Sequence, residues 1–300
     1  NFELTLANNP KSLYQLLDLL KNYIQKSGIA KNKIVGIGIG MPGFVDIKKS
    51  INNTYLKPAR GNVVSELESE LGVPVFIDND SSLVALAELK FGKALNRKNS
   101  MVINIGWGVG LGMILNGELF RGNNGFAGEF SHIPIFTNNK ICGCGKSGCL
   151  ETETSLLVII DKAIKGIKEG KSTSLKDISM DHPEAAAHSI IEAALHGDSF
   201  SIDLITEVGY NIGRGVAILI HILNPELIVL SGRGSLAGRL WRAPIQQAIN
   251  KLCIPKIAED TTIEISQMNY QAEIIGTACL VMDQIDKRKF LLTHEKSLIS

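Results

Sequence analysis

Residues 128–151 read GEFSHIPIFTNNKICGCGKSGCLE, a segment with three cysteines within eight positions. Zinc prefers four tetrahedral ligands drawn from thiolates and imidazoles, and a structural Cys₃His site leaves no coordination position open. Cys142, Cys144 and Cys149 supply three thiolates, and His132 lies ten positions before the first of them. Glycines between the cysteines let a short loop fold around an ion. The spacing predicts that these four residues bind one structural zinc ion. The alternative is a group of buried free thiols beside an unrelated histidine.

The composition is that of a globular protein and excludes several classes. The chain has 300 residues, 45% hydrophobic and 20% charged, which is enough for one or two domains. Lys and Arg total 31 against 30 for Asp and Glu, so the chain lacks the basic excess of a nucleic-acid-binding surface. No apolar run reaches the roughly 18–20 residues that span a bilayer, and the start lacks the features of a signal peptide. The sequence predicts a cytoplasmic protein that makes no membrane contact.

Helical and strand patterns alternate along the chain and predict an α/β fold. Short β-branched or apolar runs predict buried strands at 33–40, 73–77, 101–105, 227–230 and 262–266. Helices are expected at 13–24, 63–71, 81–91 with Asp80 as N-cap, 156–170, 183–195, 199–223, 236–251 and 272–285. We expect a first lobe over 1–98 and a helix-rich second lobe over 99–283 that carries the zinc loop 132–151. The first lobe would be incomplete at its N-terminus and completed by the segment 284–300.

Several motifs together resemble the ROK family, whose name covers repressors, unassigned reading frames and kinases. The signature Cys142-x-Cys144-Gly-x-x-Gly148-Cys149-x-Glu151, preceded by Gly128-Glu129-x-x-His132, is similar to that of the family. The similarity extends through motifs at 40–46, 78–80, 85–88, 224–226 and 275–278. It implies a two-lobed actin-like ATPase or sugar kinase fold, which is ribonuclease H-like, with a zinc-stabilised loop. In this family the sugar lies between the lobes, and the kinases bind ATP beside it.

The resemblance also implies a set of sugar-binding residues. Asn79 and Asp80 would contact sugar hydroxyls, and in a kinase Asp80 would be the general base for the hydroxyl that attacks the γ-phosphate. Helix capping by Asp80 is compatible with that contact. The other sugar contacts that the resemblance implies are Glu129, His132, Glu151, Gly43 and Thr54. His132 would bind zinc through one ring nitrogen and donate to the sugar through the other, because coordination fixes its tautomer.

The loops that bind ATP in the kinases of the family are altered in this chain. Their first phosphate loop, Asp-x-Gly-Gly-Thr, has no counterpart in the sequence. The second, Gly-Thr-Gly-x-Gly-x-Gly, is here Gly106-Trp107-Gly108-Val-Gly110-Leu-Gly112, so a bulky indole replaces a small hydroxyl donor. The glycine triplet expected after the late strand is Ser231-Gly232-Arg233. We therefore expect a degenerate nucleotide loop that comprises Gly106, Trp107, Gly108, Gly110 and Gly232.

Intact sugar residues beside degraded nucleotide loops are typical of the family's sugar-responsive transcriptional regulators, those of the NagC and Mlc type. The sequence predicts the sugar-sensing effector and oligomerisation domain of such a regulator. It would bind a hexose, an amino sugar or a sugar phosphate as a homodimer or homotetramer. DNA contact is expected only through a helix-turn-helix domain that this chain does not contain, and the missing initiator Met and opening strands predict N-terminal truncation.

Two other functions stay open. An ATP-dependent hexose or N-acetylhexosamine kinase would use magnesium and would make Asp80 a catalytic residue, and only Trp107 and the turn at 231–233 argue against it. A zinc-stabilised interaction module without a small ligand would leave Asn79, Asp80 and the glutamates unexplained.

Overall fold

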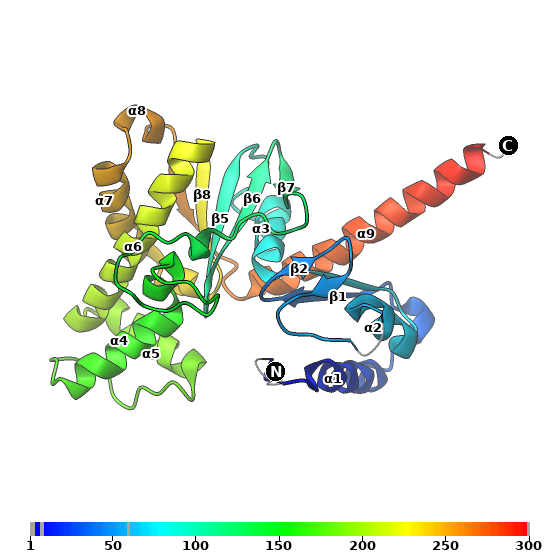
Figure 1. Ribbon diagram of the computed structural model, residues 1–300, viewed down its shortest axis with the longest axis horizontal. Helices are drawn as coiled ribbons and strands as arrows, with labels where there is room; N and C mark the ends of the chain where they lie inside the picture. Colours follow the sequence, from blue (N-terminus) through cyan, green and yellow to red (C-terminus); the bar gives the residue numbers. More distant parts are fainter. Residues whose placement is uncertain (1–3, 7–8, 59–60, 299–300) are drawn as a thin grey trace.

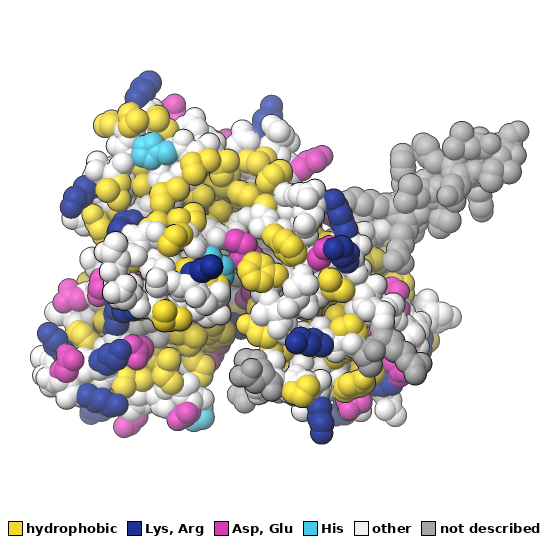
Figure 2. Space-filling model, viewed as in Figure 1, with side chains coloured by type: hydrophobic (Ala, Val, Ile, Leu, Met, Phe, Trp, Pro, Cys, Tyr) yellow, Lys and Arg dark blue, Asp and Glu magenta, His cyan; other side chains and the backbone are white. Residues whose placement is uncertain are grey.

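The computed structural model describes residues 4–6, 9–58 and 61–298, with side chains described as far as Asp286. Figure 1 shows two α/β lobes, one built from the N-terminal third of the chain and one from the middle. The surface is hollowed between them on the face seen in Figure 2. The end of the predicted segment 284–300, residues 299–300, lies outside the described part. Within that part, no helix is both long and apolar enough to cross a bilayer.

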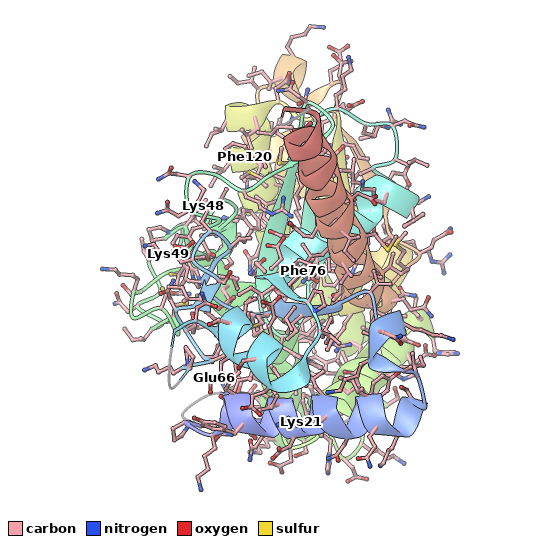
Figure 3. All side chains as sticks on the ribbon, turned by 90° about the vertical axis from the view of Figure 1, so that its right-hand side faces the viewer. Lys21, Lys48, Lys49, Glu66, Phe76 and Phe120 are labelled. Carbon is pink, nitrogen blue, oxygen red and sulfur yellow. The ribbon has the colours of Figure 1, made fainter. Side chains whose placement is uncertain are left out.

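The first lobe has two small sheets and two covering helices. Its main strands, β1 (Ile37–Met41) and β4 (Val75–Asn79), are parallel, while β2 (Val45–Asp46) and β3 (Ile51–Asn52) form an antiparallel pair. Figure 3 shows α1 (Ser12–Ser27) and α2 (Val63–Leu71) side by side. Lys21 of α1 donates to Glu70 of α2 at 2.6 Å. Buried leucines of both helices pack on the valines and isoleucines of β1 and β4.

The second lobe has a five-stranded sheet in the order β7-β6-β5-β8-β9. Its strands are β5 (Ser100–Ile105), β6 (Val109–Leu115), β7 (Glu118–Phe120), β8 (Leu227–Ser231) and β9 (Thr262–Ile265). The helices of this lobe are α4 (Leu156–Lys168), α5 (Pro183–Leu195), α6 (Ser199–Leu223), α7 (Arg242–Leu252) and α8 (Pro255–Ala258). Single-turn or distorted 3₁₀ segments occur in both lobes. They are η1 (Lys31–Lys33) in the first lobe, and η2 (Phe130–His132), η3 (Leu150–Glu153) and η4 (Arg233–Trp241) in the second. The turns after β5 and β8 lie at the same sheet edge, because these strands are parallel neighbours.

Two helices join the lobes. The helix α3 (Asp80–Phe91) follows β4 and packs on β5 and β6 of the other lobe. It is buried on nearly all sides from Ser81 to Glu88. The long C-terminal helix α9 (Gln271–Leu298) packs on α3 and on β1 and β4, and Phe76 of β4 lies beside it in Figure 3. The contacts of α9 with the first lobe come from residues such as Thr277 and Val281, which approach Gly38 of β1, so the expectation that the segment 284–300 completes this lobe stays a prediction.

Gly276 sets the distance between α9 and α3. A Cβ at this position would overlap the backbone carbonyl of Leu83 on α3. We expect Gly276→Ala to destabilise the protein by about 1–3 kcal/mol, the usual effect of overpacking a close contact. Urea unfolding would measure the change. The neighbouring Ala278→Gly would serve as the control, because it adds no methyl group to a close contact. Its loss of stability should be smaller and should reflect helix propensity alone. Unchanged stability of Gly276→Ala would contradict the close approach.

Candidate functional site

The four residues of the predicted zinc site lie together in the structure. Their ligand atoms all lie within 4.8 Å of one another, and the four are His132, Cys142, Cys144 and Cys149. The sulfur atoms of Cys144 and Cys149 are 3.6 Å apart, and Cys142 Sγ is 3.5 Å from His132 Nδ1. Zinc–sulfur bonds of about 2.3 Å in a tetrahedron place two sulfur ligands about 3.8 Å apart. Three thiols and an imidazole at these separations fit a structural zinc ion.

The backbone of the loop holds these thiols in place. Cys142 N donates to Lys146 O at 2.8 Å and Gly145 N donates to Cys142 O at 2.9 Å, which closes a tight turn around the first two cysteines. Gly148 has a φ of +75°, and a Cβ there would overlap the Phe136 carbonyl oxygen. Only glycine allows this approach. Gly145, with a φ of +84°, and Gly148 therefore serve the geometry of the loop, whereas a side chain at Gly143 would meet no described neighbour.

His132 faces the cysteines with one ring nitrogen and a carboxylate with the other. Its Nδ1 lies 3.5 Å from Cys142 Sγ, and its Nε2 lies 3.6 Å from Glu129 Oε2. A metal bond at Nδ1 would leave the proton on Nε2, aimed toward Glu129 or toward a hydroxyl between the two groups. This orientation supports the double role of His132, which stays a prediction.

The start of α3 positions the next two predicted sugar ligands. Asn79 is the N-cap, and its Oδ1 accepts from the backbone N–H groups of Ser81 and Ser82 at 3.0 and 3.1 Å. The prediction that Asp80 caps this helix is wrong, because the helix begins one residue earlier, at Asp80 itself. Asp80 Oδ1 accepts from Ser81 N at 2.7 Å. A carboxylate in the first turn is favoured by the partial positive charge of the helix N-terminus.

Gly43 lies against Asn79, and Thr54 lies against Gly43. Asn79 Nδ2 donates to Gly43 O at 3.3 Å, and Thr54 Oγ1 accepts from Phe44 N at 3.0 Å. Gly43 has a φ of +79°, and a Cβ there would stand 2.5 Å from Thr54 Oγ1. Position 43 therefore has room only for glycine. The structure brings these three predicted residues together, and their contact with a sugar stays a prediction.

Carboxylates gather around Asp80. Burial, with a smaller contribution from the negative charges of Glu273 and Glu129, raises the pKa of Asp80 to about 6 against the hydrogen bonds from Ser81, which lower it. Burial also raises the pKa of Glu129, with the charge of Glu151 acting in the same direction and that of His132 in the opposite one. Glu129 is therefore close enough to influence Asp80, and Glu151 is close enough to influence Glu129. Such a group offers several acceptors to vicinal hydroxyls. The sequence analysis missed Glu273, which comes from α9.

An ion pair between the lobes fixes the strand that carries Asn79. Arg121, next to β7, donates from Nε and Nη2 to Asp78 Oδ2 of β4 at 3.0 and 2.7 Å. Asp78 is 1% exposed, and its other oxygen accepts from Asn79 N at 2.8 Å. Burial raises the pKa of Asp78, while Arg121 lowers it. The pair holds the Asn79–Asp80 turn against the second lobe. Sequence analysis included Asp78 in a family motif but gave no signal for Arg121.

Glu151 connects the zinc loop with the glycine-rich turn 106–112. Val109 N lies 3.4 Å from Glu151 Oε2, and a Cβ on Gly108 would stand 2.7 Å from the same oxygen. Gly110 approaches Ser81 so closely that a Cβ there would overlap the Ser81 hydroxyl. The predicted nucleotide loop and the predicted sugar site therefore share a wall.

A cavity of about 370 Å³ adjoins the same turn. Its lining residues are Trp107, Leu156, Glu184, Ala185, Ala187, His188, Ile191, Arg233 and Leu236. The guanidinium carbon of Arg233 stands 5.6 Å from the centre of the Trp107 ring, and Arg233 Nη1 lies 3.7 Å from Glu184 Oε1. Gly232 has a φ of +76°, which glycine adopts without strain. The two residues that depart most from the kinase pattern, Trp107 and Arg233, thus lie in contact range of each other.

Comparison with known proteins identifies similar chains of two kinds. A model described as the ROK family matches residues 5–284. The chain is 33% identical over 276 residues to a glucokinase from Halalkalibacterium halodurans, an alignment that covers 90% of this chain and 82% of that protein. It is 31% identical over 282 residues to a xylose repressor from Caldicellulosiruptor bescii, which covers 92% of this chain and 69% of that protein. The similarity extends to kinases and repressors almost equally.

The expected architecture is confirmed by a solved structure. A ROK family glucokinase from Streptomyces griseus, in complex with glucose and AMPPNP, matches this chain with a TM-score of 0.77 and 26% sequence identity. The match covers 90% of this chain and 88% of that one. The two-lobed sugar kinase fold is therefore the fold of this protein.

Proposed function

Because the chain belongs to the ROK family, we propose that it is the sugar-sensing and oligomerisation part of a transcriptional regulator. A hexose or an amino sugar would bind between the lobes and would not be phosphorylated. DNA contact would come from a helix-turn-helix domain outside this chain. Zinc would be a structural ion that orients His132 and Glu151.

The contact between Trp107 and Arg233 carries this proposal. Kinases of the family have threonine and glycine at these positions, so their phosphate loop is open. Here an indole and a guanidinium stand 5.6 Å apart beside the loop, an arrangement that attracts the cation to the ring. The positive charge of Arg233 is already compensated by Glu184 at 3.7 Å and lies in range of Glu273. The arrangement therefore leaves little unpaired positive charge for phosphates.

The sugar site offers a route from ligand to regulation. Asp80 lies at the start of α3, whereas Glu129 and Glu151 belong to the second lobe. A sugar bound to all three would favour one relative position of the lobes, and its effect is limited to its difference in affinity for the two positions. The Asp78–Arg121 pair spans the same junction. Lobe position would then alter the geometry of the oligomer and of the attached DNA-binding domains.

An ATP-dependent sugar kinase is the second candidate. The glucokinase relative is the more identical of the two compared, at 33% against 31%. Asp80 also suits a general base, because a carboxyl with a pKa of about 6 accepts a proton readily near neutral pH. Backbone amides of the glycine-rich turn can bind phosphate without the threonine. The side chains of Trp107 and Arg233 beside the phosphate loop are what favour the regulator over the kinase.

Calorimetry combined with a phosphorylation assay tests the proposal. We expect glucose, xylose or N-acetylglucosamine to bind the chain without nucleotide, and we expect no measurable change in affinity when ATP and magnesium are added. A coupled assay for ADP should show no turnover above a protein-free blank. ADP release that depends on sugar, and that Asp80→Asn abolishes, would establish the kinase instead.

A further inference from the structure

We propose that the cavity beside Trp107 is a second sugar subsite, so that the ligand is a disaccharide or a longer glycan rather than a single monosaccharide. This inference rests on the proposed sugar-sensing function and names the class of its ligand. The first ring would occupy the site around Asp80 and Glu151. The second would enter the space beside the phosphate loop.

The two spaces lie on either side of one short turn. Trp107 lines the cavity, and the next residue, Gly108, lies against Glu151 of the sugar site. Consecutive Cα atoms are about 3.8 Å apart, so the indole and the sugar-site carboxylate belong to adjacent walls. Leu156 also lines the cavity, and its N–H donates to Gly106 O at 3.0 Å. The proposal therefore requires a glycosidic bond that passes this turn.

The chemistry of the cavity suits a pyranose. A sugar ring has an apolar face of C–H groups and a rim of hydroxyls, so it needs both an apolar surface and hydrogen-bonding groups. The cavity combines the Trp107 ring and the side chains of Leu156, Ile191 and Leu236 with the polar groups of Glu184 and Arg233. Its volume of about 370 Å³ lies in the lower part of the roughly 300–1,000 Å³ range of small-molecule pockets.

The indole N–H of Trp107 supports a polar ligand. Trp107 is half-buried, and its indole N–H is not enclosed by the described part of the protein, so a ligand can reach it. The second tryptophan differs, since Trp241 Nε1 donates to Gly234 O at 2.7 Å in the core. A half-buried indole N–H normally finds a partner. A hydroxyl of the second sugar ring would accept this hydrogen bond, and Arg233 and Glu184 would contact other hydroxyls from the opposite side.

The resemblance to the kinases indicates which hydroxyl of the first sugar would carry the glycosidic bond. In a kinase, the hydroxyl beside Asp80 is the one that faces the nucleotide. The same hydroxyl of a sensed sugar would face the cavity, so a substituent on it would enter the space. Disaccharides that differ only in linkage can therefore report on the geometry of the two subsites.

Titration calorimetry with matched sugars tests the proposal. The probes are glucose with maltose, cellobiose, isomaltose and gentiobiose, xylose with xylobiose, and N-acetylglucosamine with chitobiose. We expect at least one disaccharide to bind at least tenfold more tightly than its own monosaccharide. Trp107→Thr and Arg233→Ala should each reduce this ratio toward one, and Trp107→Phe should retain part of it. Arg239→Ala provides the matched control, because Arg239 lines a neighbouring cavity instead, and it should leave the ratio unchanged.

Tryptophan fluorescence gives a second readout, since the chain has only two tryptophans. Trp241 is fully buried, so a change in emission on adding the disaccharide should come from Trp107 and disappear in Trp107→Phe. A monosaccharide that binds without any tighter disaccharide would overturn this inference and leave the sensor function standing. A ratio of disaccharide to monosaccharide affinity that is unchanged in both Trp107→Thr and Arg233→Ala would also overturn this inference and leave the sensor function standing. Failure of every sugar to bind would overturn the sensor function and the second subsite together.

Discussion

Asp80→Asn is expected to weaken sugar binding by about 10- to 100-fold and, at the same time, to stabilise the folded protein at pH 7. Hydrogen bonds to a charged group contribute about 1.5–3 kcal/mol, and the amide retains the shape of the side chain without its charge. The wild-type affinity should also fall as the pH drops below about 6, because the Asp80 carboxylate becomes protonated there. The variant should lack this pH dependence.

The gain in stability follows from the direction of the pKa change. Burial raises the pKa of Asp80 from 3.8 to about 6, so folding favours its protonated form. The stabilising contribution of that form is fully present below about pH 3.8 and is lost as the pH rises through about 6. Asparagine resembles the protonated form at every pH. The free energy of unfolding should therefore increase by about 1–3 kcal/mol at pH 7, and the difference from wild type should vanish toward pH 4.

Calorimetry for the affinity and urea unfolding at pH 4, 5, 6 and 7 for the stability would measure both effects. Asp161→Asn is a suitable control, because Asp161 is an exposed residue of α4 that pairs with Lys165. That substitution should change neither quantity by more than about 0.5 kcal/mol. Retained sugar affinity in Asp80→Asn would remove Asp80 from the binding site. A loss of stability at pH 7 would show that its carboxylate is better solvated than its burial implies.

Local patterns in the sequence predicted much of this molecule. The strand β5 and the glycines that follow it were evident from a short β-branched run and the glycine pattern, but β6 begins at Val109, inside the segment expected to be a loop. The zinc ligands were predictable for a similar reason: three of them lie in one short loop, so spacing alone brings them together. The start of α3 was misjudged by one residue and the end of β4 by two, because Asn79 and Asp80 can both cap a helix and only the backbone decides between them.

Contacts between distant segments could not be predicted in this way. Asp78 and Arg121 are 43 positions apart and meet only because β4 and β7 belong to lobes that face each other. Trp107 and Arg233 appeared in the sequence as two separate departures from the kinase pattern. Parallel pairing of β5 and β8 places the turns after these strands side by side. The two changes thus form a single contact, which no analysis of either motif could reveal.

Cys149→Ser is expected to remove the zinc ion, to lower stability and to weaken sugar binding together. Cys149 is fully buried and immediately precedes η3, the segment that carries Glu151. Structural zinc contributes directly to folding. We expect the free energy of unfolding to fall by at least about 3 kcal/mol, which corresponds to a drop in Tm of several degrees. Zinc content, measured by atomic absorption, should fall from one ion per chain to near zero.

The loss of sugar affinity should be at least tenfold, because zinc bound to Nδ1 would orient His132 and aim Nε2 at the region of Glu129. Cys253→Ser is the matched control: Cys253 is also buried but lies beside Ala217, away from the cluster. It should retain zinc and sugar binding even if its stability decreases slightly. Removal of zinc from the wild type with a chelator separates folding from orientation. A zinc-free chain that stays folded, by circular dichroism, and binds sugar with unchanged affinity would show that the ion supports only its own loop. A zinc-free chain that stays folded but binds sugar more weakly would instead show that zinc supports sugar binding by orienting His132.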